Sequence, residues 1–339
     1  MGIINFALSG NYKRFYNNLK EISKKNKKPA FIMFIDTAIS TLLLGSGLQD
    51  YLNYKFYEKS FKERKKYVTI GNMAKAYETL ANIEYAPFFS NKVNFHKNFS
   101  KFTKRDFLSP DDTYKNFEDF INKHEEFVLK PQVGLGGGGV EKVNIKAIKD
   151  KKKFFEDIKN NKCFIEELIE QDENWGALSP KSINTLRIMT AAVNGKSKII
   201  FAAARIGSRK NNSRQFSSRR KRCTSRFKTG KLSGNGIDKK LNESEESITG
   251  IKFDGFQISY WEEIKEMVLE AALVNDKVNL VGWDVAISKN GPLIIEGNRG
   301  PGFDLVQILL KKGTKYMLDD LLQEVKEGKL KEEKEKTVI

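Results

Sequence analysis

The sequence is poor in the residues that build covalent cross-links and metal sites of sulfur and imidazole. Among 339 residues there are 2 cysteines and 2 histidines. Cys163 and Cys223 cannot form a disulfide framework, which is typical of a protein from a reducing cytoplasm. So few histidines also argue against a zinc site or a catalytic triad built on histidine.

Proline is also scarce, with 7 residues, whereas hydrophobic residues make up 40% of the chain. This composition favours a folded globular protein, and the length is ample for two or three subdomains. No internal repeat is visible. We expect no signal peptide, because the lysine-rich region lies downstream of a mixed N-terminal segment.

Acidic charge is in deficit, since Lys and Arg number 60 against 43 Asp and Glu, giving a formal net charge of +17. A basic excess often indicates a nucleic-acid or anionic-surface partner. Here most of the excess is scattered lysine without interleaved arginine and aromatic residues, which is typical of a solvated surface. Nucleic-acid binding is therefore not the favoured interpretation.

One apolar stretch, residues 29–48, is near the length of a membrane span and follows the basic run Lys24–Lys28. Asp36 lies near its middle, and a charged residue is costly inside a bilayer. We therefore expect a buried or interfacial helix in a cytoplasmic protein. Peripheral attachment to a membrane stays open as an alternative.

The most informative feature lies near the C-terminal end, where Gly282-Trp283-Asp284 is followed by Glu296-Gly297-Asn298. Residues 281–287 and 292–295 predict two adjacent strands joined by a turn. Glu296 and Asn298 are two apart and point to one face, so we expect them to converge with Asp284 at the strand ends. Two carboxylates and an amide oxygen suit Mg²⁺ and are poor ligands for Zn²⁺. The alternative is a polar hairpin end with solvated acids.

A lysine and a glycine-rich loop occur earlier in the chain. Residues 127–131 predict a short strand that contains Lys130, and residues 134–140 follow it with five glycines. Glycines let backbone N–H groups approach an anion closely, and a lysine before them neutralises phosphate charge. The loop is not a Walker A sequence, because no Gly-Lys-Ser/Thr closes it. Taken alone, it also fits a flexible loop.

A third segment, residues 163–173, predicts an apolar strand that runs into a cluster of acids. Its backbone groups suit pairing with an adenine edge, and a carboxylate suits ribose hydroxyls. A strand end with solvated acids is the alternative.

The order of these features resembles the ATP-grasp superfamily. It is most similar to the sugar-transfer-associated branch, whose members look like ligases that accompany surface-polysaccharide genes. The resemblance extends over about residues 50–312. The motifs that carry it are Lys130 with its glycine loop, Glu166-Glu167, Asn184-Thr185-Leu186-Arg187, Gly282-Trp283-Asp284, and Glu296-Gly297-Asn298 followed by Pro301-Gly302.

The resemblance implies ATP and Mg²⁺ as cofactors and a role for each matching residue. Arg187 would steady the γ-phosphate or an acyl-phosphate. Arg205, on a strand predicted over residues 199–206, would contact substrate or phosphate, with a surface arginine as the alternative. The other implied contacts are Lys92 and Lys130 with the phosphates, Gly136, Gly137, Gly138 and Gly139 as a lid over them, Glu166, Glu167 and Ile169 with the adenine, Glu173 with the ribose, and Asp284, Glu296 and Asn298 with Mg²⁺.

The implied fold is α+β, with two α+β lobes that clamp a nucleotide after an N-terminal helical region. We expect this helical region over residues 1–85, a lobe with the lysine and glycine loop over 86–175, a lobe with the metal site over 176–315, and a charged helical tail over 316–339. A helix is also predicted over residues 114–123, with its N-cap at residues 110–112.

The implied reaction is Mg·ATP-dependent ligation, in which a carboxylate forms an acyl-phosphate and an amine then displaces the phosphate. No residue stands out as a general base, so catalysis would rest on positioning and charge neutralisation. The substrates would be small-molecule or sugar-linked carboxylates and amines in surface-polysaccharide or cell-envelope modification. A phosphotransferase with a hydroxyl acceptor, and a non-catalytic relative that binds nucleotide or anionic polymer, stay open. No feature of the sequence specifies the oligomeric state.

Residues 214–228 depart from the family pattern of Asp-Asn, Gly-Gly and a strand before Thr-Gly. Thr229-Gly230 is present, but the segment before it holds seven basic and no acidic residues. Codon degeneracy permits a coding string for residues 214–227 that, read one base later, gives Asp-Asn-Phe-Gln-Ala-Gly-Gly-Lys-Gly-Val-Pro-Val-Asp. We hypothesise compensating frameshifts near Ser213 and Phe227. With the printed segment, the loop is expected to lack its family role.

Overall fold

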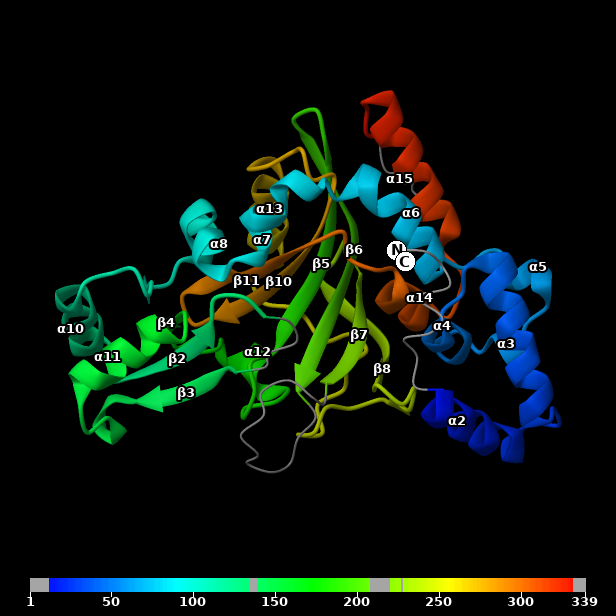
Figure 1. Cartoon of the computed structure of the whole chain (residues 1–339), viewed down its shortest axis with the longest axis horizontal. Helices are drawn as coiled ribbons and strands as arrows, with labels where there is room; N and C mark the ends of the chain where they lie inside the picture. Colours follow the sequence, from blue (N-terminus) through cyan, green and yellow to red (C-terminus); the bar gives the residue numbers. More distant parts are fainter. Residues whose placement is uncertain (1–11, 135–138, 208–219, 227, 332–339) are drawn as a thin grey trace. The chain divides into compact units, whose positions relative to one another are not determined.

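A computed structural model of the chain describes residues 12–134, 139–207, 220–226 and 228–331 (Figure 1). These residues belong to two compact units. One unit joins the N-terminal residues up to Ala81 to the C-terminal segment Gly300–Lys331, and the other contains Asn82–Arg299. The chain therefore leaves the first unit and returns to it only after the second is complete.

The first unit is helical throughout its described part, as the sequence predicts for the N-terminal region. Its core contains the stacked rings of Tyr54 and Tyr67, whose centroids lie 5.0 Å apart, and the buried ring of Phe56. Its elements are α2 (Tyr12–Lys25), α3 (Ala30–Leu44), α4 (Leu48–Asn53), η1 (Phe56–Glu58), α5 (Phe61–Arg64), α6 (Ile70–Leu80), α14 (Asp304–Leu310) and α15 (Lys315–Glu327).

One buried glutamine joins the two chain segments of this unit. The backbone N–H of Val68 donates to Oε1 of Gln307 over 2.7 Å, and Nε2 of Gln307 donates back to the Val68 carbonyl over 2.9 Å. The backbone N–H of Thr314 also donates to Oε1 of Gln307. A buried backbone segment between helices thus receives partners from α14.

The apolar stretch around Asp36 forms α3, which ends at Gly45 with a φ of +64°. Phe31 is 63% exposed and Leu42 is 77% exposed, so of the two predicted alternatives, a buried or an interfacial helix, the buried one is wrong. Among the described residues, none of the helices combines the length and apolarity needed to span a bilayer.

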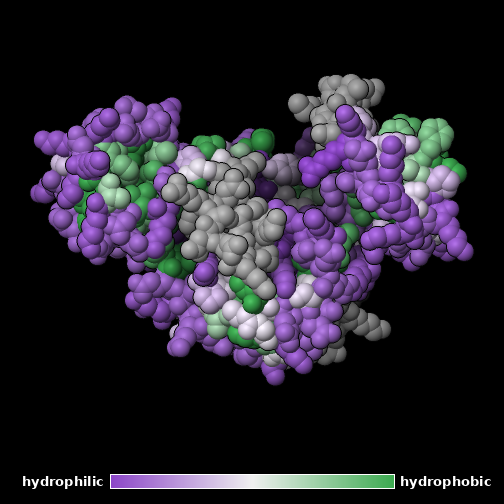
Figure 2. Space-filling view, turned by 90° about the horizontal axis from the view of Figure 1, so that it is seen from below, coloured by the Kyte–Doolittle hydropathy of each residue, from purple (hydrophilic) through white to green (hydrophobic). Residues whose placement is uncertain are grey.

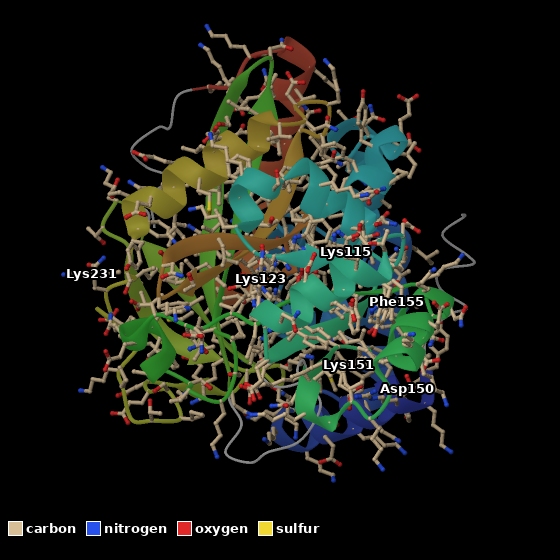
Figure 3. The ribbon with its side chains drawn as sticks, turned by 90° about the vertical axis from the view of Figure 1, so that its left-hand side faces the viewer. Lys115, Lys123, Asp150, Lys151, Phe155 and Lys231 are labelled. Carbon is tan, nitrogen blue, oxygen red and sulfur yellow. The ribbon has the colours of Figure 1, made fainter. Side chains whose placement is uncertain are left out.

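The second unit contains a small antiparallel sheet in the order β1-β4-β2-β3. Helices α10 (Tyr114–Lys123) and α11 (Lys151–Asn160) cover one face of it, with Phe155 buried and Lys115 and Lys151 exposed (Figure 3). The strands are β1 (Phe107–Leu108), β2 (Glu126–Pro131), β3 (Glu141–Asn144) and β4 (Cys163–Glu167).

Helix α10 has the predicted bounds, but its N-cap is Thr113 rather than residues 110–112. The Thr113 side chain accepts a hydrogen bond from the backbone N–H of Asn116, and the Asn116 side chain accepts one from the Thr113 N–H. This reciprocal arrangement is a capping box. The carboxylate of Asp112 instead accepts from the Ser109 N–H over 2.7 Å.

The larger sheet has seven antiparallel strands in the order β11-β10-β5-β6-β7-β8-β9. Helix α13 (Trp261–Leu273) packs on β5 and β6, and α7 (Ala86–Ser90), α8 (Lys92–Asn98) and α9 (Ser100–Thr103) pack on β11. The strands are β5 (Thr185–Val193), β6 (Lys196–Gly207), β7 (Arg220–Arg226), β8 (Lys231–Ile237), β9 (Glu243–Ser244), β10 (Leu280–Ser288) and β11 (Gly291–Arg299).

The segment between β4 and α12 (Glu173–Ala177) ties the small sheet to the large one. The Asp172 N–H donates to the Ile287 carbonyl over 3.0 Å, and the Lys289 N–H donates to the Glu170 carbonyl over 2.9 Å. The second unit is thus built as two lobes, each with its own sheet and core, in agreement with the predicted α+β class.

Candidate functional site

Two carboxylates lie opposite each other on adjacent strands of the large sheet. Asp284 on β10 and Glu296 on β11 are cross-strand partners, and Gly282 is paired with Asn298. The three side chains were expected at strand ends, but β11 continues to Arg299, so they lie inside the paired region. A register irregularity after Asp284 accompanies this pairing.

The neighbours of these residues explain the local sequence. Because side chains alternate along a strand, Trp283 points into the core, where it is fully buried and donates from Nε1 to Thr190 Oγ1 over 2.8 Å. Gly297 lies on the same core face. A Cβ there would meet rings of Phe89, Phe95 and Trp283 at 3.0–3.1 Å. Glycine therefore allows the aromatic core to pack directly beneath the strand that carries Glu296.

Two arginines hold the Asp284 carboxylate. Arg187, its partner on β5, donates from Nε over 2.6 Å and from Nη2 over 3.0 Å, and Arg205 Nη1 donates to both oxygens over 2.9 Å. Burial alone would raise the pKa of Asp284, but the two guanidinium groups outweigh it and lower the pKa to about 2. Asp284 is thus ionised at neutral pH, and both predicted arginines converge on it.

Glu296 is shifted in the opposite direction. Burial raises its pKa, and the adjacent Asp284 carboxylate, with which it shares a hydrogen bond, raises it further. Asn298 Nδ2 donates to Glu296 Oε1 over 3.3 Å and to the Gly282 carbonyl over 3.4 Å. Two carboxyl groups that lie against each other mark a place where a cation would relieve their repulsion.

The donor set fits a hard divalent cation such as Mg²⁺. Carboxylate and amide oxygens are its preferred ligands. Within the described ranges, no cluster of three His, Cys, Asp or Glu side chains is arranged for metal binding. The predicted set therefore depends on the Asn298 amide in addition to Asp284 and Glu296.

Lys130 lies at the other side of the site, at the end of β2, and forms an ion pair with the carboxylate of Glu166. Glu166 is 2% exposed and also accepts from Arg105 Nη1 over 2.8 Å and contacts His96 Nε2 over 2.9 Å. Burial alone would raise the pKa of Glu166, but Arg105, Lys130 and His96 hold it well below its usual range. The Glu166 carboxylate thus faces Lys130 in a buried network.

Arg105 and His96 were not singled out in the sequence. Burial lowers the pKa of His96, which favours the neutral imidazole. Nδ1 of His96 and Nε and Nη2 of Arg105 have no hydrogen-bond partner among the described residues. Neither residue stands in a recognisable motif, and both meet Glu166 only through tertiary packing, so no local signal could have found them.

Lys92 is the first residue of α8, which Asn91 caps by accepting from the N–H groups of Val93 and Asn94. Its Nζ donates to the carbonyls of Gly134 over 3.0 Å and Pro131 over 3.4 Å. Burial lowers the pKa of Lys92. Glu296 opposes this shift, whereas the nearby charge of Lys130 adds to it. The two predicted lysines therefore lie close together, within electrostatic reach of Glu296 and Glu166.

The other predicted nucleotide contacts follow β4. Glu167 Oε2 accepts from the Asp106 N–H over 3.2 Å, so its carboxylate turns toward the β1 side. Ile169 is half-buried just after the strand, and Glu173 is the exposed first residue of α12. Gly136, Gly137 and Gly138 lie outside the described residues. Gly139 has a φ of +73°, and a Cβ there would meet Pro131 at 3.3 Å.

Strand β7 brings further arginines to the same face of the sheet. Arg220 donates from Nη1 to Thr185 Oγ1 over 3.1 Å, and Arg222 is the cross-strand partner of Arg205. Burial lowers the pKa of Arg220, and the nearby Arg205 lowers it further. On the opposite face, Cys223 and Ser225 are fully buried. The rest of the anomalous segment up to residue 219, and residue 227, lie outside the described residues.

The Asn184-Thr185-Leu186-Arg187 strand also has a physical explanation. Asn184 is fully buried; its Nδ2 donates to the Trp175 carbonyl over 2.9 Å, and its Oδ1 accepts from the Gly207 N–H over 3.2 Å. Leu186 belongs to the core, and Arg187 faces the carboxylates. The asparagine thus fixes α12 and β6 against the strand that presents Arg187.

Solved structures that match parts of the chain include N5-carboxyaminoimidazole synthetase from Staphylococcus aureus with ADP, at 11% identity and a TM-score of 0.43, covering 66% of this chain and 48% of that one. The ATP-grasp ligase PsnB with its minimal precursor has 14% identity and a TM-score of 0.44, with coverages of 73% and 63%. The D-alanine–D-alanine ligase from Coxiella burnetii has 13% identity and a TM-score of 0.40, with coverages of 73% and 62%. The chain thus spans between about half and just under two thirds of their lengths.

No curated protein matches the sequence. The family model described as sugar-transfer associated ATP-grasp matches residues 53–325. This range contains every residue predicted for the site. It also includes the segments 135–138 and 208–219, so the match runs through both the glycine loop and the anomalous region. The chain belongs to the sugar-transfer associated ATP-grasp family.

Proposed function

We propose that the protein is a Mg·ATP-dependent ligase that joins a carboxylate to an amine through an acyl-phosphate. The observation that carries the proposal is the cross-strand pair of the buried Asp284 and the half-buried Glu296, whose pKa values are shifted apart, with Arg187 and Arg205 beside it. Perturbed carboxyl groups ringed by cations are typical of functional sites. Family membership adds the expectation of a nucleotide at this site.

In this proposal Asp284, Glu296 and Asn298 hold Mg²⁺. The metal, when bound, supplies positive charge that neutralises the transferring phosphoryl group. Asp284 suits this role because its pKa of about 2 keeps it ionised at neutral pH. Glu296 faces it from β11, with its pKa raised by burial and by the Asp284 carboxylate.

Lys92 and Lys130 bind the phosphates of ATP, and Gly136, Gly137, Gly138 and Gly139 cover them. Lys130 is already oriented by Glu166, whose carboxylate is itself held by Arg105. The side chain of Glu166 is thus a positioning group for Lys130. The adenine lies along the end of β4, at Glu166, Glu167 and Ile169. Glu173 binds the ribose.

The chemical steps need little covalent work from the protein. The substrate carboxylate attacks the γ-phosphorus and forms an acyl-phosphate as ADP leaves; the amine then attacks the acyl carbon and releases phosphate. Arg187, fixed by two hydrogen bonds to Asp284, stabilises the negative charge that develops on the phosphoryl oxygens. Arg205 contacts the same phosphate or the substrate carboxylate. Positioning by the two lobes supplies the remaining rate enhancement.

The description of the family, which associates it with sugar transfer, supports a proposal for the substrate class. We infer small-molecule or sugar-linked carboxylates and amines from surface-polysaccharide or cell-envelope modification, acted on in the cytoplasm.

A catalytically impaired nucleotide-binding relative is the second candidate, and β7 favours it. Arg220 and Arg222 add positive charge beside Arg205, where the reading one base later has glycines. Like charges on facing strands oppose each other and compete for the same carboxylates. Such a protein would bind Mg·ATP without turning it over.

The test is ADP release from the purified chain with Mg·ATP against panels of carboxylates, amines and sugar hydroxyls, with products weighed by mass spectrometry. An amide product, together with ADP and phosphate, supports the ligase. A phosphorylated hydroxyl product would instead identify a phosphotransferase. Mg·ATP binding without turnover on any acceptor would identify the impaired relative, and failure to bind Mg·ATP would contradict both proposals.

A further inference from the structure

Helix α3 turns two polar side chains inward beside Met33, and most of its large apolar side chains outward. Thr37 and Ser40 are buried, whereas a helix that packs only against a core shows the reverse arrangement. Its exposed large side chains are Phe31, Ile32, Ile35, Ile39, Leu42 and Leu43, with exposed fractions from 45% to 77%. Four of them recur at spacings of three and four residues and form one continuous face.

Polar contacts fix this orientation. Arg64, which is 6% exposed, donates from its two terminal nitrogens to the two oxygens of Asp36, each over 2.7 Å. Nη1 of Arg64 also donates to Ser40 Oγ over 2.9 Å, and the hydroxyl of Tyr51 donates to Asp36 over 2.8 Å. Turning the apolar face inward would expose the bidentate Asp36–Arg64 ion pair to solvent. The apolar side chains would gain no contact surface that fits them better. Asp36 therefore lies at the edge of the apolar face, with its charge paired to Arg64.

Basic side chains flank the apolar face. Helix α2 packs on α3 through Phe15 and Tyr16, whose rings lie 6.4 and 5.8 Å from Phe34. Residues 12–28 contain one acid, Glu21. Their exposed basic residues are Lys13, Arg14, Lys20, Lys24, Lys25, Lys27 and Lys28. In Figure 2 the hydrophobic surface at the right lies where Figure 1 shows α3, next to hydrophilic surface.

We propose that α3 and the basic residues of α2 and the α2–α3 loop form a docking surface for a lipid bilayer with anionic headgroups. An apolar face edged by exposed lysines matches the two layers of such an interface, acyl chains below and negative headgroups above. A protein partner of purely apolar surface would not use the lysines.

The length of the helix sets the mode of docking. Fifteen residues extend about 22 Å at 1.5 Å per residue, less than the hydrocarbon core of about 30 Å. The helix therefore lies in the plane of the interface rather than crossing it, with Ile35 and Leu42 toward the acyl chains. This proposal does not depend on the ligase reaction.

The experiment is co-sedimentation of the full chain with vesicles of phosphatidylcholine alone or mixed with phosphatidylglycerol. We expect the anionic vesicles to bind at least about tenfold more protein, with the difference reduced by salt. Replacing two apolar residues with charge, Ile35→Glu with Leu42→Glu, should weaken binding by about tenfold or more.

Matched controls separate the surface from general effects of charge. Ile83→Glu changes an isoleucine that is 70% exposed in the other unit and should bind as the wild type does. Lys24→Glu with Lys27→Glu should lose binding to anionic vesicles, whereas Lys151→Glu with Lys152→Glu on α11 should retain it. Unchanged far-ultraviolet circular dichroism would show that each variant is folded.

A tryptophan introduced on α3 reports directly whether this helix enters the bilayer. Phe31→Trp puts an indole at a position that is 63% exposed, and its fluorescence should shift to the blue on adding anionic vesicles. No binding to anionic vesicles, or equal binding by the Ile35→Glu, Leu42→Glu variant, would overturn the proposal. So would concentration-dependent self-association abolished by that variant in the absence of vesicle binding, because the face would then join two copies of the chain.

Discussion

Strands β11 and β7 belong to the same sheet, yet their sequences fit their positions very differently. On β11, Gly297 admits the aromatic core on one face while Glu296 and Asn298 face the carboxylate site on the other. On β7, Ser225 is fully buried and its hydroxyl has no partner among the described residues, while Arg222 lies opposite Arg205. The side chains of β11 therefore suit both the core face and the site face of the sheet, whereas those of β7 suit neither.

The frameshift hypothesis accounts for the poorly fitting residues of β7 one by one. The reading one base later places valine at positions 223 and 225, which are fully buried on the core face of the strand, and glycine at 220 and 222, where arginines now crowd the site. It places proline at 224, beside a register irregularity in the pairing with β8, where proline is tolerated. The burial pattern thus agrees with the shifted reading, and resequencing the gene across this region tests it.

The largest effect is expected on the consistent strand. Glu296→Gln keeps the size of the side chain but removes the charge that would hold Mg²⁺, so ADP release should fall by about a hundredfold to a thousandfold. Glu262→Gln, on the exposed surface of α13, is the matched control. Wild-type ADP release by Glu296→Gln would refute the metal assignment; if the printed chain shows no turnover, the same comparison is made by Mg·ATP binding.

The Glu166 network provides a reference in which cations and carboxylate are matched. Arg105→Met removes one partner of a buried pair and should lower the free energy of unfolding by about 3 kcal/mol at neutral pH, measured by urea denaturation. Lys101→Met, an exposed lysine paired with the exposed Glu270, should change it by less than about 1 kcal/mol.

The Glu166 network also predicts that the free energy of unfolding depends on pH. Because the folded-state pKa of Glu166 lies well below its ordinary value of 4.5, its stabilisation is present above pH 4.5 and is lost as the pH falls toward the folded-state pKa. The wild type should therefore lose stability in this acidic range, and Arg105→Met should lose less. Parallel pH profiles for the two proteins would show that Arg105 does not act through Glu166.

A smaller effect on stability is expected when the sequence of β7 is replaced by the reading one base later. A chain carrying the shifted reading over residues 214–226 should gain about 2 kcal/mol in unfolding free energy, because buried valines replace Cys223 and Ser225. Its ADP release should exceed that of the printed chain, since Arg220 and Arg222 no longer compete at the site. Equal or lower stability of the restored chain would count against the hypothesis.

The smallest effect isolates one side chain of β7. Ser225→Val removes a buried hydroxyl that lacks a partner and should stabilise the protein by about 1 kcal/mol. Ser40→Val is the counterpart, since that buried serine accepts from Arg64 over 2.9 Å and its loss should be destabilising. Thermal unfolding of both variants gives the sign; destabilisation by Ser225→Val would show that its hydroxyl has a partner.

Local patterns in the sequence predicted the fold class, helix 114–123 and the site face of the β10–β11 hairpin. Spacing by two put Glu296 and Asn298 on one face, because alternation is a property of any strand. The cross-strand pairing of Asp284 with Glu296, inside the strands rather than at their ends, depends on register and was not visible locally.

What could not be predicted rests on contacts between residues far apart in the chain. Arg105 and His96 approach Glu166 across 61 and 70 positions of sequence, and neither belongs to a motif. The outward turn of α3 depends on Arg64, which is 28 residues from Asp36. In the sequence of the helix alone, Asp36 argues against contact with lipid. In the structure, its ion pair with Arg64 determines which face of α3 is exposed.

The link between Gln307 and Val68 has a consequence for the order of events during synthesis. The segment Asn82–Arg299 must emerge from the ribosome before Gln307 can reach the Val68 backbone. At 5–20 residues per second this delay is roughly ten to forty seconds. Throughout that interval the N-terminal helices lack their C-terminal partners, so a nascent chain has time to meet a chaperone or a membrane before its first-made unit can close.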